Sequence, residues 1–329
     1  MPIMRIVFHG DSAGAFSEGF ANLLHRPAEI VALPDALTGE ADRRAYAAAD
    51  VIVSFTFNDT MPRPECLTLL HVPGAGYDAV DFEALPPSAV VCNCFGHEQA
   101  IAEYVIAALL MRQVPLADAD RRLRSGEWAY KAGPVTAVHA ELAEMTIGLL
   151  GFGHIGQAVA ARAKAFEMRV HVANRSPVAV SPLVDRAFLL SDLPAFWASA
   201  DFFVVALPLT ADTRRIVDAA AFAAMRSTAV VVNVGRGPTI DERALYGALK
   251  SRRIAGAVID TWYTYPSVAS PRGYPSSLPF HELDNVVMTP HMSGWTLGTI
   301  RRRQRVIAGN IERRMSGEPC VNVVRQATG

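Results

Sequence analysis

A glycine-punctuated turn near the middle of the chain constrains the fold more than any other feature. An apolar run at 146–150 is followed by Gly151, Gly153 and Gly156, then by an alanine-rich stretch with good helix propensity and a second apolar run at 168–173. Glycines at this spacing allow a tight turn, close approach of the backbone to a pyrophosphate, and close helix packing. The helix amino terminus adds N–H groups and partial positive charge that suit phosphates. The turn therefore predicts a βαβ unit that binds a dinucleotide.

The end of the second strand of this unit indicates which dinucleotide is bound. An NAD site usually has an acidic residue about 20 residues past the glycines, where it binds the ribose 2′-hydroxyl. Here the segment is Asn174-Arg175-Ser176, without a carboxylate. A guanidinium can pair with a 2′-phosphate, and a serine hydroxyl can donate to it. The segment favours NADP, with NAD as the alternative; the preference does not follow if Arg175 is only a solvated surface residue.

Length and composition restrict the class of protein. The 329 residues suffice for two domains, and 51% hydrophobic with 19% charged residues is ordinary for a globular protein. A net charge of −1 argues against nucleic acid or an anionic membrane as the main partner. The four cysteines lack metal-ligand spacing, and Cys92 and Cys94 are expected to pack on one face of a strand. We find no signal peptide and no apolar run of membrane-spanning length, so we expect a cytoplasmic protein without a metal site.

Strands alternate with helices along most of the chain, which predicts parallel sheets. In the first third we expect strands at 4–8, 29–32, 51–55, 69–72 and 90–92, a helix at 41–49 and a longer helix from Glu98 to about 113. After the glycine turn we expect strands at 201–206, 229–234, 254–259 and 285–289 and a helix at 297–314. Residues 262–282 contain four prolines and are expected to form an irregular loop. The cluster Arg301-Arg302-Arg303 is interpreted as a solvated helix face.

Two residues that follow predicted strands can carry chemistry. Arg236 stands between two glycines, and His291 follows a proline. A guanidinium can bind a carboxylate and polarise a carbonyl, while an imidazole exchanges a proton near neutral pH. A cofactor that donates hydride to a 2-oxo acid needs both partners. Since open α/β sheets bind ligands at the carboxyl ends of strands, we predict that both are catalytic. The alternatives are a salt bridge for Arg236 and an ordinary turn histidine for His291.

Several motifs together resemble one family. The turn Gly151–Gly156, Leu207-Pro208-Leu209-Thr210 with Thr213, Asn233–Gly237, Asp260 and Pro290-His291 are similar to motifs of the D-isomer-specific 2-hydroxyacid dehydrogenases. The resemblance covers nearly the whole chain. It implies an α/β fold in which a Rossmann-type, doubly wound parallel sheet (98–295, dinucleotide-binding) is inserted in a second, flavodoxin-like α/β domain (1–97 and 296–329, substrate-binding). It also implies a homodimer and a small 2-oxo or 2-hydroxy acid as substrate, as in glyoxylate and hydroxypyruvate reductases.

The resemblance further implies roles for individual residues. Arg236 would bind the substrate carboxylate and carbonyl, and His291 would be the general acid in reduction and the base in oxidation. Backbone N–H groups of Ala75 and Gly76 would hold the carboxylate, which agrees with the neighbouring glycines leaving donors exposed. The resemblance places His154 and Ile155 at the pyrophosphate, Asp260 at the nicotinamide, and Pro208, Thr213, Val234, Gly235 and Gly294 along the dinucleotide.

The glutamate with which this family usually pairs its catalytic histidine is missing. Its position, five residues after Asp260, is occupied by Tyr265, which we therefore expect at the substrate site. A carboxylate would raise the pKa of the histidine, whereas a neutral phenol offers a hydrogen bond without charge. We predict that His291 titrates lower than in relatives with the glutamate. The alternative is that another carboxylate, such as Glu282, reaches His291.

Two other functions stay open at this point. Formate dehydrogenases of the same superfamily also lack the glutamate, although His97 and Tyr265 stand where an asparagine and a glutamine are expected; phosphite oxidation is a related alternative. A dinucleotide-sensing regulator would not need both Arg236 and His291. Aromatic residues that either line a pocket or belong to the core are Phe57, Tyr77, Trp262, Tyr263, Tyr265 and Trp295.

Overall fold

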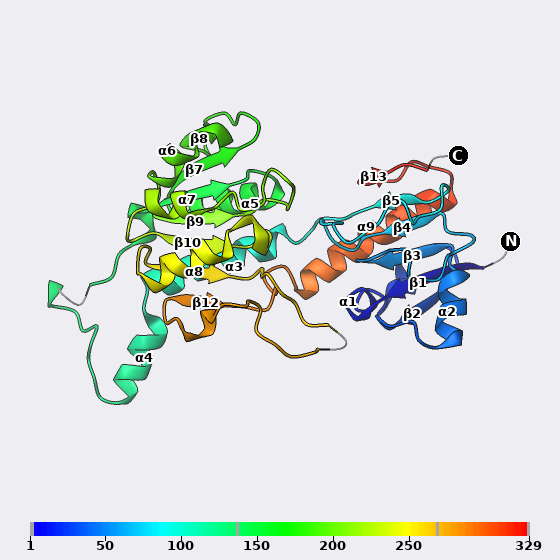
Figure 1. Cartoon of the computed structure of the whole chain (residues 1–329), viewed down its shortest axis with the longest axis horizontal. Helices are drawn as coiled ribbons and strands as arrows, with labels where there is room; N and C mark the ends of the chain where they lie inside the picture. The colour runs from blue at the N-terminus through cyan, green and yellow to red at the C-terminus, as the bar shows by residue number, and fades with distance from the viewer. Residues whose placement is uncertain (1–2, 136–137, 268–269, 328–329) are drawn as a thin grey trace. The chain divides into compact units, whose positions relative to one another are not determined.

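The computed structural model describes residues 3–135, 138–267 and 270–327, and the chain divides into two compact units (Figure 1). The first unit comprises the chain up to Gly96 and from Trp295 onward, and the second comprises His97–Gly294. Residues 1–2 and 328–329 of the predicted substrate domain, and residues 268–269 of the predicted loop, lie outside the described residues. Each unit is built around its own sheet, and the α/β fold predicted from the sequence is confirmed.

The sheet of the first unit has the strand order of flavodoxin-like folds. β2, β1, β3, β4 and β5 lie side by side in that order and run parallel, and β13 is added antiparallel to β5. The strands are β1 (Met4–His9), β2 (Ala28–Leu33), β3 (Val51–Ser54), β4 (Leu69–His71), β5 (Val90–Cys92) and β13 (Val323–Arg325). The helices are α1 (Asp11–Gly14), α2 (Glu40–Ala47) and α9 (Leu297–Met315), with the 3-10 helix η1 (Phe20–Leu23).

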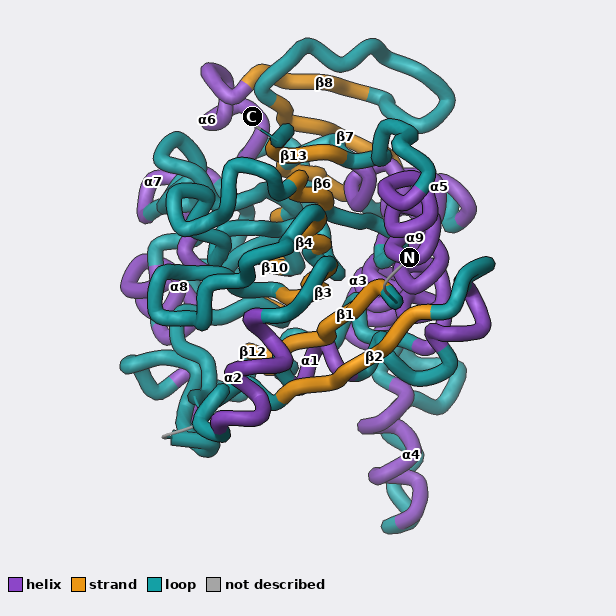
Figure 2. Tube along the Cα trace, turned by 90° about the vertical axis from the view of Figure 1, so that its right-hand side faces the viewer, coloured by secondary structure: helices purple, strands orange, loops and turns teal. Residues whose placement is uncertain are grey.

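Apolar side chains cover both faces of this first sheet. Ile6 of β1 packs into one cluster and Val7 into the other, because successive strand residues point to opposite faces. α9 contributes Ile307 and Ile311 to the cluster of Ile6, and α2 contributes Tyr46 to the cluster of Val7. Figure 2 shows the two helices on opposite sides of strands β1 to β4.

The sheet of the second unit is a Rossmann-type sheet. Its order is β12-β11-β10-β9-β6-β7-β8, which is the order 3-2-1-4-5-6 of dinucleotide-binding sheets with one further parallel strand. The strands are β6 (Thr146–Leu150), β7 (Arg169–Asn174), β8 (Arg186–Leu189), β9 (Phe202–Val205), β10 (Val230–Asn233), β11 (Gly256–Ile259) and β12 (Val286–Met288). The strand order reverses between β6 and β9, and ligands bind at such switch points.

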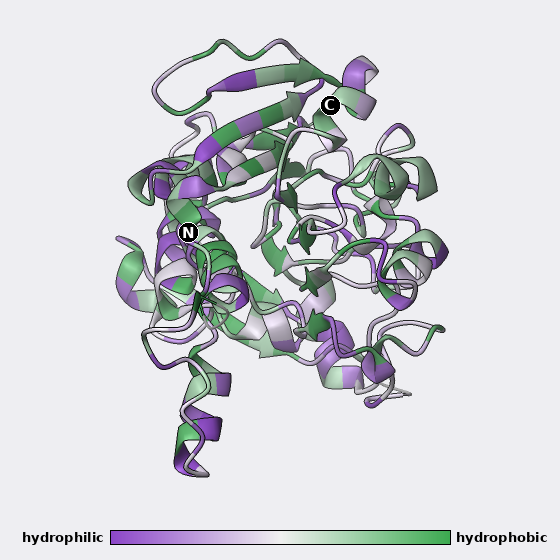
Figure 3. Cartoon of the chain, turned by 90° about the vertical axis from the view of Figure 1, so that its left-hand side faces the viewer, coloured by the Kyte–Doolittle hydropathy of each residue, from purple (hydrophilic) through white to green (hydrophobic). Residues whose placement is uncertain are grey.

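Helices cover both faces of the second sheet. α3 (Glu98–Gln113) and α5 (His154–Ala165) share one apolar cluster with the sheet, and α6 (Leu193–Trp197), α7 (Ala219–Ala224) and α8 (Glu242–Lys250) share the other. The 3-10 helices are η3 (Leu142–Glu144), η4 (Leu190–Asp192), η5 (Gly237–Thr239) and η6 (Phe280–Glu282). In Figure 3 the central strands are largely green, as expected for strands buried on both faces. The unit is therefore doubly wound, as predicted.

One helix of the second unit has no buried side chain. α4 (Leu116–Arg124) follows α3 after a 49° bend and extends away from the rest of its unit (Figure 1).

In the described residues no single helix is long and apolar enough to cross a membrane, although α3 and α4 taken together reach that length and composition. Seven residues of α3 are buried, namely Ala100, Ile101, Ala102, Val105, Ile106, Ala108 and Leu109, so the apolar side chains of this helix pack inside the unit.

Three sequence-based expectations need correction. The edge strands β8 and β13 were not expected, because short edge strands carry little apolar patterning. Cys94 is buried but lies beyond the end of β5, so it does not share a strand face with Cys92. The arginine cluster is a solvated face only at Arg301, which is exposed: the guanidinium of Arg302 donates to the carbonyl of Gly96, and Arg303, 8% exposed, donates to that of Phe95. These two arginines therefore bind backbone carbonyls of the segment that follows β5.

Candidate active site

The glycine turn between β6 and α5 has the geometry that its sequence predicts. Gly151 has φ +98°, a conformation that L side chains rarely adopt. A Cβ on Gly156 would lie 2.3 Å from the carbonyl oxygen of Gly151, so only glycine lets the helix approach the turn. A Cβ on Gly153 would meet nothing within 4 Å, and α5 begins at the next residue, His154. The turn thus leaves open space before a helix amino terminus, which fits the pyrophosphate of a dinucleotide.

The residues at the end of β7 also fit a dinucleotide. The Asn174 amide accepts a hydrogen bond from the Phe152 N–H at 3.4 Å and donates to the carbonyl of Ser176 at 3.0 Å, which ties the end of β7 to the glycine turn. Arg175 and Ser176 are exposed. Their side chains are therefore accessible at the position where a ribose substituent would lie.

The ends of β9 and β10 are held close together by backbone packing. The hydroxyl of Thr213 donates to the Pro208 carbonyl at 2.6 Å, which fixes the loop after β9. Val234 and Gly235 are buried, and a Cβ on Gly235 would lie 2.7 Å from the carbonyl oxygen of Leu207. These residues lie just after the carboxyl ends of β9 and β10, where the sequence predicts contacts with the cofactor.

Arg236 follows β10 and is half-buried in a segment fixed by hydrogen bonds. The side chain of Asn233 accepts from the Gly235 N–H at 3.1 Å and donates to the Arg236 carbonyl at 3.2 Å. The Thr239 hydroxyl donates to the same carbonyl at 2.6 Å. Since both bonds engage the main chain of Arg236, the guanidinium is carried on a rigid backbone.

His291 lies in a loop that one buried carboxylate organises. Asp260, at the end of β11, is fully buried and accepts from the Thr289 hydroxyl at 2.6 Å and from the N–H groups of Met292 at 2.9 Å and Ser293 at 3.0 Å. His291 has φ +58°, an uncommon conformation for a residue other than glycine. The carboxylate thus stabilises a strained turn that presents His291, a role that sequence reasoning missed when it assigned Asp260 to the cofactor alone.

The partner of His291 is Tyr265. The Tyr265 hydroxyl lies 3.0 Å from His291 Nδ1 and accepts from the Trp262 N–H at 3.0 Å. Among the described residues Glu282 forms no hydrogen bond or ion pair with His291, whereas the Tyr265 ring lies 5.7 Å from the imidazole, centroid to centroid. Desolvation by surrounding protein atoms lowers the pKa of His291, Asp260 opposes this, and the charge of Arg236 lowers the pKa further. Burial raises the pKa of Tyr265, so the phenol stays protonated at neutral pH.

The loop after β4 in the first unit has the donors expected of an anion site. The N–H groups of Ala75 and Gly76 donate to no other residue in the described chain. The Asn93 amide donates to the Ala75 carbonyl at 2.7 Å, and the Cys94 N–H donates to that of Gly74 at 3.1 Å. Asn93 is 5% exposed. It therefore positions this loop, a role that local sequence patterns do not indicate because the bond spans eighteen residues of chain.

The aromatic candidates separate into core and exposed residues. Phe57 and Trp262 are at most 3% exposed and belong to the core. Tyr77, Tyr265 and Trp295 are between 39% and 48% exposed. Tyr263 is half-buried and lines a pocket, so it and the exposed rings are the candidates for contact with a ligand.

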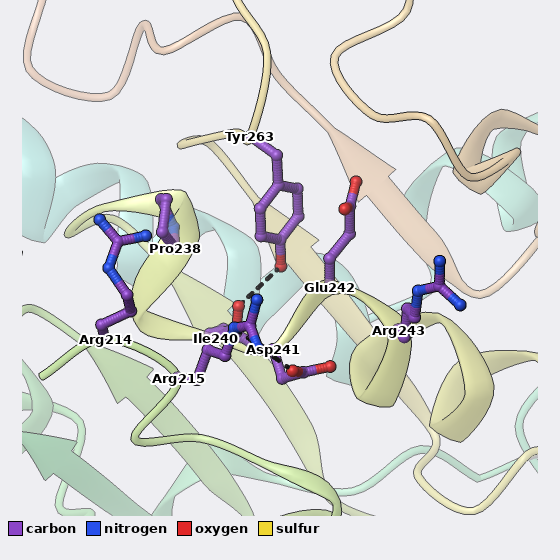
Figure 4. Close-up of a pocket in the computed structure, with 8 residues that line it drawn as sticks. All are labelled: Arg214, Arg215, Pro238, Ile240, Asp241, Glu242, Arg243 and Tyr263. Carbon is purple, nitrogen blue, oxygen red and sulfur yellow. Dashed lines mark hydrogen bonds and ion pairs between the residues drawn. The ribbon is translucent and has the colours of Figure 1, made fainter.

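A pocket of about 280 Å³ lies beside Pro238, Ile240 and Asp241 (Figure 4). It is lined by Arg214, Arg215, Pro238, Ile240, Asp241, Glu242, Arg243 and Tyr263. The Tyr263 hydroxyl donates to the Ile240 carbonyl at 3.3 Å. This bond joins the segment after Arg236 to the segment before Tyr265, so the pocket wall supports two predicted site residues.

Neither metal ligands nor disulfides are seen at these positions. Within residues 3–135, 138–267 and 270–327, no group of three or more His, Cys, Asp or Glu side chains is placed to hold a metal ion. The four cysteines are free thiols. The remaining predicted cofactor residue, Gly294, is packed so that a Cβ would lie 3.3 Å from the Cβ of His97.

Comparison with known proteins identifies the family. The family model described as "D-isomer specific 2-hydroxyacid dehydrogenase, NAD binding domain" matches residues 106–293, more than half of the chain. The chain belongs to the D-isomer-specific 2-hydroxyacid dehydrogenases. The matched residues lie within the second unit of this dehydrogenase, which contains the glycine turn, Arg236 and His291.

Curated relatives match both units of the dehydrogenase. It is 32% identical over 294 residues to glyoxylate/hydroxypyruvate reductase B from Salmonella newport, covering 86% of this chain and 85% of the relative. It is 30% identical over 301 residues to D-3-phosphoglycerate dehydrogenase from Methanocaldococcus jannaschii, covering 88% of this chain but spanning only 54% of the relative's length. A solved D-isomer-specific 2-hydroxyacid dehydrogenase from Xanthobacter autotrophicus, in complex with NADPH, is 27% identical with a TM-score of 0.78, covering 99% of this chain and 98% of the other.

Proposed function

We propose that this dehydrogenase is an NADP-preferring reductase of small 2-oxo acids. The observation that carries the proposal is the hydrogen bond between His291 Nδ1 and Tyr265, in a loop close enough to Arg236 for the guanidinium charge to act on the imidazole. The similarity to a glyoxylate/hydroxypyruvate reductase supports the substrate class. The opposite direction, oxidation of the 2-hydroxy acid, uses the same groups by microscopic reversibility.

The residues of the chain have complementary tasks in this reaction. A bound nicotinamide dinucleotide supplies the hydride that reduces the carbonyl carbon. Arg236 neutralises the substrate carboxylate and polarises the carbonyl. His291 gives the Nε2 proton of its imidazolium to the carbonyl oxygen as charge develops there. The N–H groups of Ala75 and Gly76 hold the carboxylate through backbone donors.

Tyr265 suits both protonation states of His291. A hydroxyl has one donor and two acceptor positions, of which one accepts from the Trp262 N–H. When the ring is neutral after giving up its Nε2 proton, its remaining proton is on Nδ1, and the second lone pair of Tyr265 accepts from Nδ1–H. When the ring is an imidazolium, the same lone pair accepts from Nδ1–H. The phenol thus orients the ring without adding the negative charge that a glutamate would bring.

The preference for NADP is proposed from the end of β7. Arg175 and Ser176 are exposed there, and the segment has no carboxylate to repel a 2′-phosphate. The NADPH-bound relative supports this cofactor. Changing Arg175 to Asp should reverse the preference, measured as the ratio of kcat/KM with NADPH to that with NADH. An unchanged ratio would refute the role of Arg175.

The activity is tested by following NADPH oxidation with a panel of 2-oxo acids. Arg236→Ala and His291→Ala should each lower kcat/KM by at least about a hundredfold, since one electrostatic or acid–base contribution is worth that much. Arg186→Ala on β8 is the matched control, because Arg186 is an exposed arginine of the same unit that does not line the pocket beside Pro238. NADPH binding without turnover would favour a regulator, and NADP reduction by formate or phosphite would favour those substrates; either result would overturn the proposal.

We also propose a homodimer that acts in the cytoplasm. The chain around α4 exposes large apolar side chains, namely Met111, Leu116, Leu123, Trp128, Tyr130 and Val135. Such a surface on an extended segment suits contact with a second copy of the chain. Light scattering should give twice the mass of the chain, and Leu123→Glu with Trp128→Glu should give the single mass. The free thiols are compatible with a reducing compartment.

A further inference from the structure

Three aromatic rings of the first unit pack together, and one of them, Phe55, lies beside the loop of Ala75 and Gly76. The Phe16 ring centroid lies 5.7 Å from that of Trp295, in a T-shaped arrangement, and 6.5 Å from that of Phe55. We call Phe16, Phe55 and Trp295 the aromatic cluster. Phe16 is fully buried, whereas Trp295 is 45% exposed. The buried ring thus supports a partly exposed apolar surface.

The aromatic cluster directly contacts the chain segment that carries the anion donors. A Cβ on Gly74 would lie 2.9 Å from a ring carbon of Phe55, so the Phe55 ring packs against the backbone of Gly74. The next two residues present the N–H groups that donate to no described residue. A carboxylate held by those groups would therefore lie near the Phe55 ring, because the ring packs on the residue just before the two donors.

The two chain segments that meet beside these donors contain no charged side chain. Residues 54–58 are Ser-Phe-Thr-Phe-Asn and residues 72–77 are Val-Pro-Gly-Ala-Gly-Tyr, without a Lys, Arg, Asp or Glu. A second anionic group on a ligand would find no cation in either segment, whereas an apolar group would bury surface against Phe55 and Trp295. The site combines one set of anion donors with an apolar wall.

We infer that the preferred substrates are 2-oxo acids with an aromatic or branched apolar side chain, and that Phe55 and Trp295 determine this specificity. The inference rests on the proposed function, because it assumes that Ala75 and Gly76 bind the substrate carboxylate. Glyoxylate has no side chain to contact the cluster, and a 2-oxo acid with a phosphate or second carboxylate meets uncharged segments. Each methylene group buried on the cluster raises kcat/KM about fourfold, so several such groups give a large preference.

The test compares kcat/KM for phenylpyruvate, 4-methyl-2-oxopentanoate and glyoxylate with NADPH. The unchanged protein should reduce the two apolar substrates at least about tenfold more efficiently than glyoxylate. Trp295→Ala and Phe55→Leu should reduce this ratio several-fold, because KM rises more for the apolar substrates than for glyoxylate. Leu297→Ala is the matched control, because Leu297 is a 70% exposed apolar residue outside the cluster and should leave the ratio unchanged.

The outcomes separate this inference from the proposed function. The inference is overturned if glyoxylate is reduced as efficiently as phenylpyruvate. It is also overturned if the ratio of kcat/KM for the apolar substrates to that for glyoxylate changes less than twofold in both cluster variants. Either result leaves the reductase proposal standing. The absence of NADPH oxidation with every 2-oxo acid would overturn both. Thermal unfolding of each variant confirms that the cluster substitutions leave the fold intact, and Phe55→Leu provides the conservative change if Trp295→Ala lowers Tm.

Discussion

Replacing Tyr265 by glutamate should move the pH dependence of reduction to higher pH. The imidazolium of His291 is the proton donor, so the reductive kcat/KM falls as pH rises through the pKa of His291, which lies below its ordinary value. A carboxylate within hydrogen-bond distance of Nδ1 favours the charged ring and raises that pKa, by about one pH unit or more. The measurement is the pH profile of kcat/KM for a 2-oxo acid.

Tyr265→Phe is the control for the glutamate variant. It keeps the ring but removes the hydroxyl that lies 3.0 Å from His291 Nδ1. Loss of one hydrogen bond, worth about 1 kcal/mol, should lower kcat/KM about fivefold without moving the profile to higher pH. An unmoved profile in Tyr265→Glu would contradict the assignment of Tyr265 as the partner of His291.

Asp260→Asn should weaken the loop that presents His291. The carboxylate accepts three hydrogen bonds in a fully buried position, and a neutral amide replaces one acceptor oxygen by a donor that faces the Ser293 or Met292 N–H. We expect a loss of about 2 kcal/mol in the free energy of unfolding and a lower kcat. Denaturant unfolding measures the first; Asp284→Asn, at an exposed ion pair with Arg252, should leave it nearly unchanged. Equal stability of the two variants would show that Asp260 does not stabilise the loop.

At the residue scale, candidate catalytic side chains could be predicted from the sequence where they follow the end of a predicted strand. Arg236 and His291 stand at such ends, and the structure brings the His291 loop together with Tyr265 and Asp260. The positioning bond of Asn93 could not be predicted, because it depends on two loops meeting after β4 and β5 have paired. Whether these residues act as proposed stays a prediction.

At the scale of elements, two glycines in helices should respond to alanine in opposite ways. Gly156→Ala puts a methyl group 2.3 Å from a carbonyl oxygen, so the turn must open and both stability and dinucleotide binding should fall. Gly247→Ala, on the exposed side of α8, meets nothing within 4 Å and should stabilise the protein by about 0.5–1 kcal/mol. Thermal unfolding with and without NADPH measures both. Tolerance of Gly156→Ala would contradict the proposed close approach of α5.

Periodicity and composition predicted most elements but not the edges of the sheets. Strands β1 to β5 lie within two residues of the expected ranges, because buried parallel strands form continuous apolar runs. β8 and β13 are short and half-exposed, so their sequences resemble loops. The prediction for Arg302 and Arg303 was wrong for a related reason: a charge pattern does not reveal that α9 packs beside backbone carbonyls distant in the sequence.

At the scale of the whole molecule, the first unit should lose stability in mild acid because of His71. This fully buried ring makes contact with the Val72 carbonyl at 3.2 Å and with the Asn310 amide at 3.1 Å, which links β4 to α9. Burial lowers the pKa of His71 to about 4 from 6.5. The unfolded chain therefore binds a proton more readily, and stability present above pH 6.5 is lost as pH falls toward 4.

The size of this effect is measurable by urea unfolding at two pH values. Between pH 7 and pH 5 the contribution of His71 should fall by about 2 kcal/mol, since each pH unit below 6.5 costs about 1.4 kcal/mol. His71→Leu should remove that part of the pH dependence while keeping the volume of an apolar side chain. An identical pH dependence in His71→Leu would show that other groups cause the acid sensitivity.

The first unit is assembled from both ends of the chain, and this has a consequence for synthesis on the ribosome. The second unit is complete at Gly294, whereas the first still needs Ile307 and Ile311 of α9 for its apolar cluster and β13 for the edge of β5. A nascent chain must therefore keep an unfinished amino-terminal sheet exposed until the final residues emerge. Early termination after residue 294 would release a product in which the second unit is folded and the first unit exposes apolar surface. Chaperones and proteases recognise such exposed apolar surface.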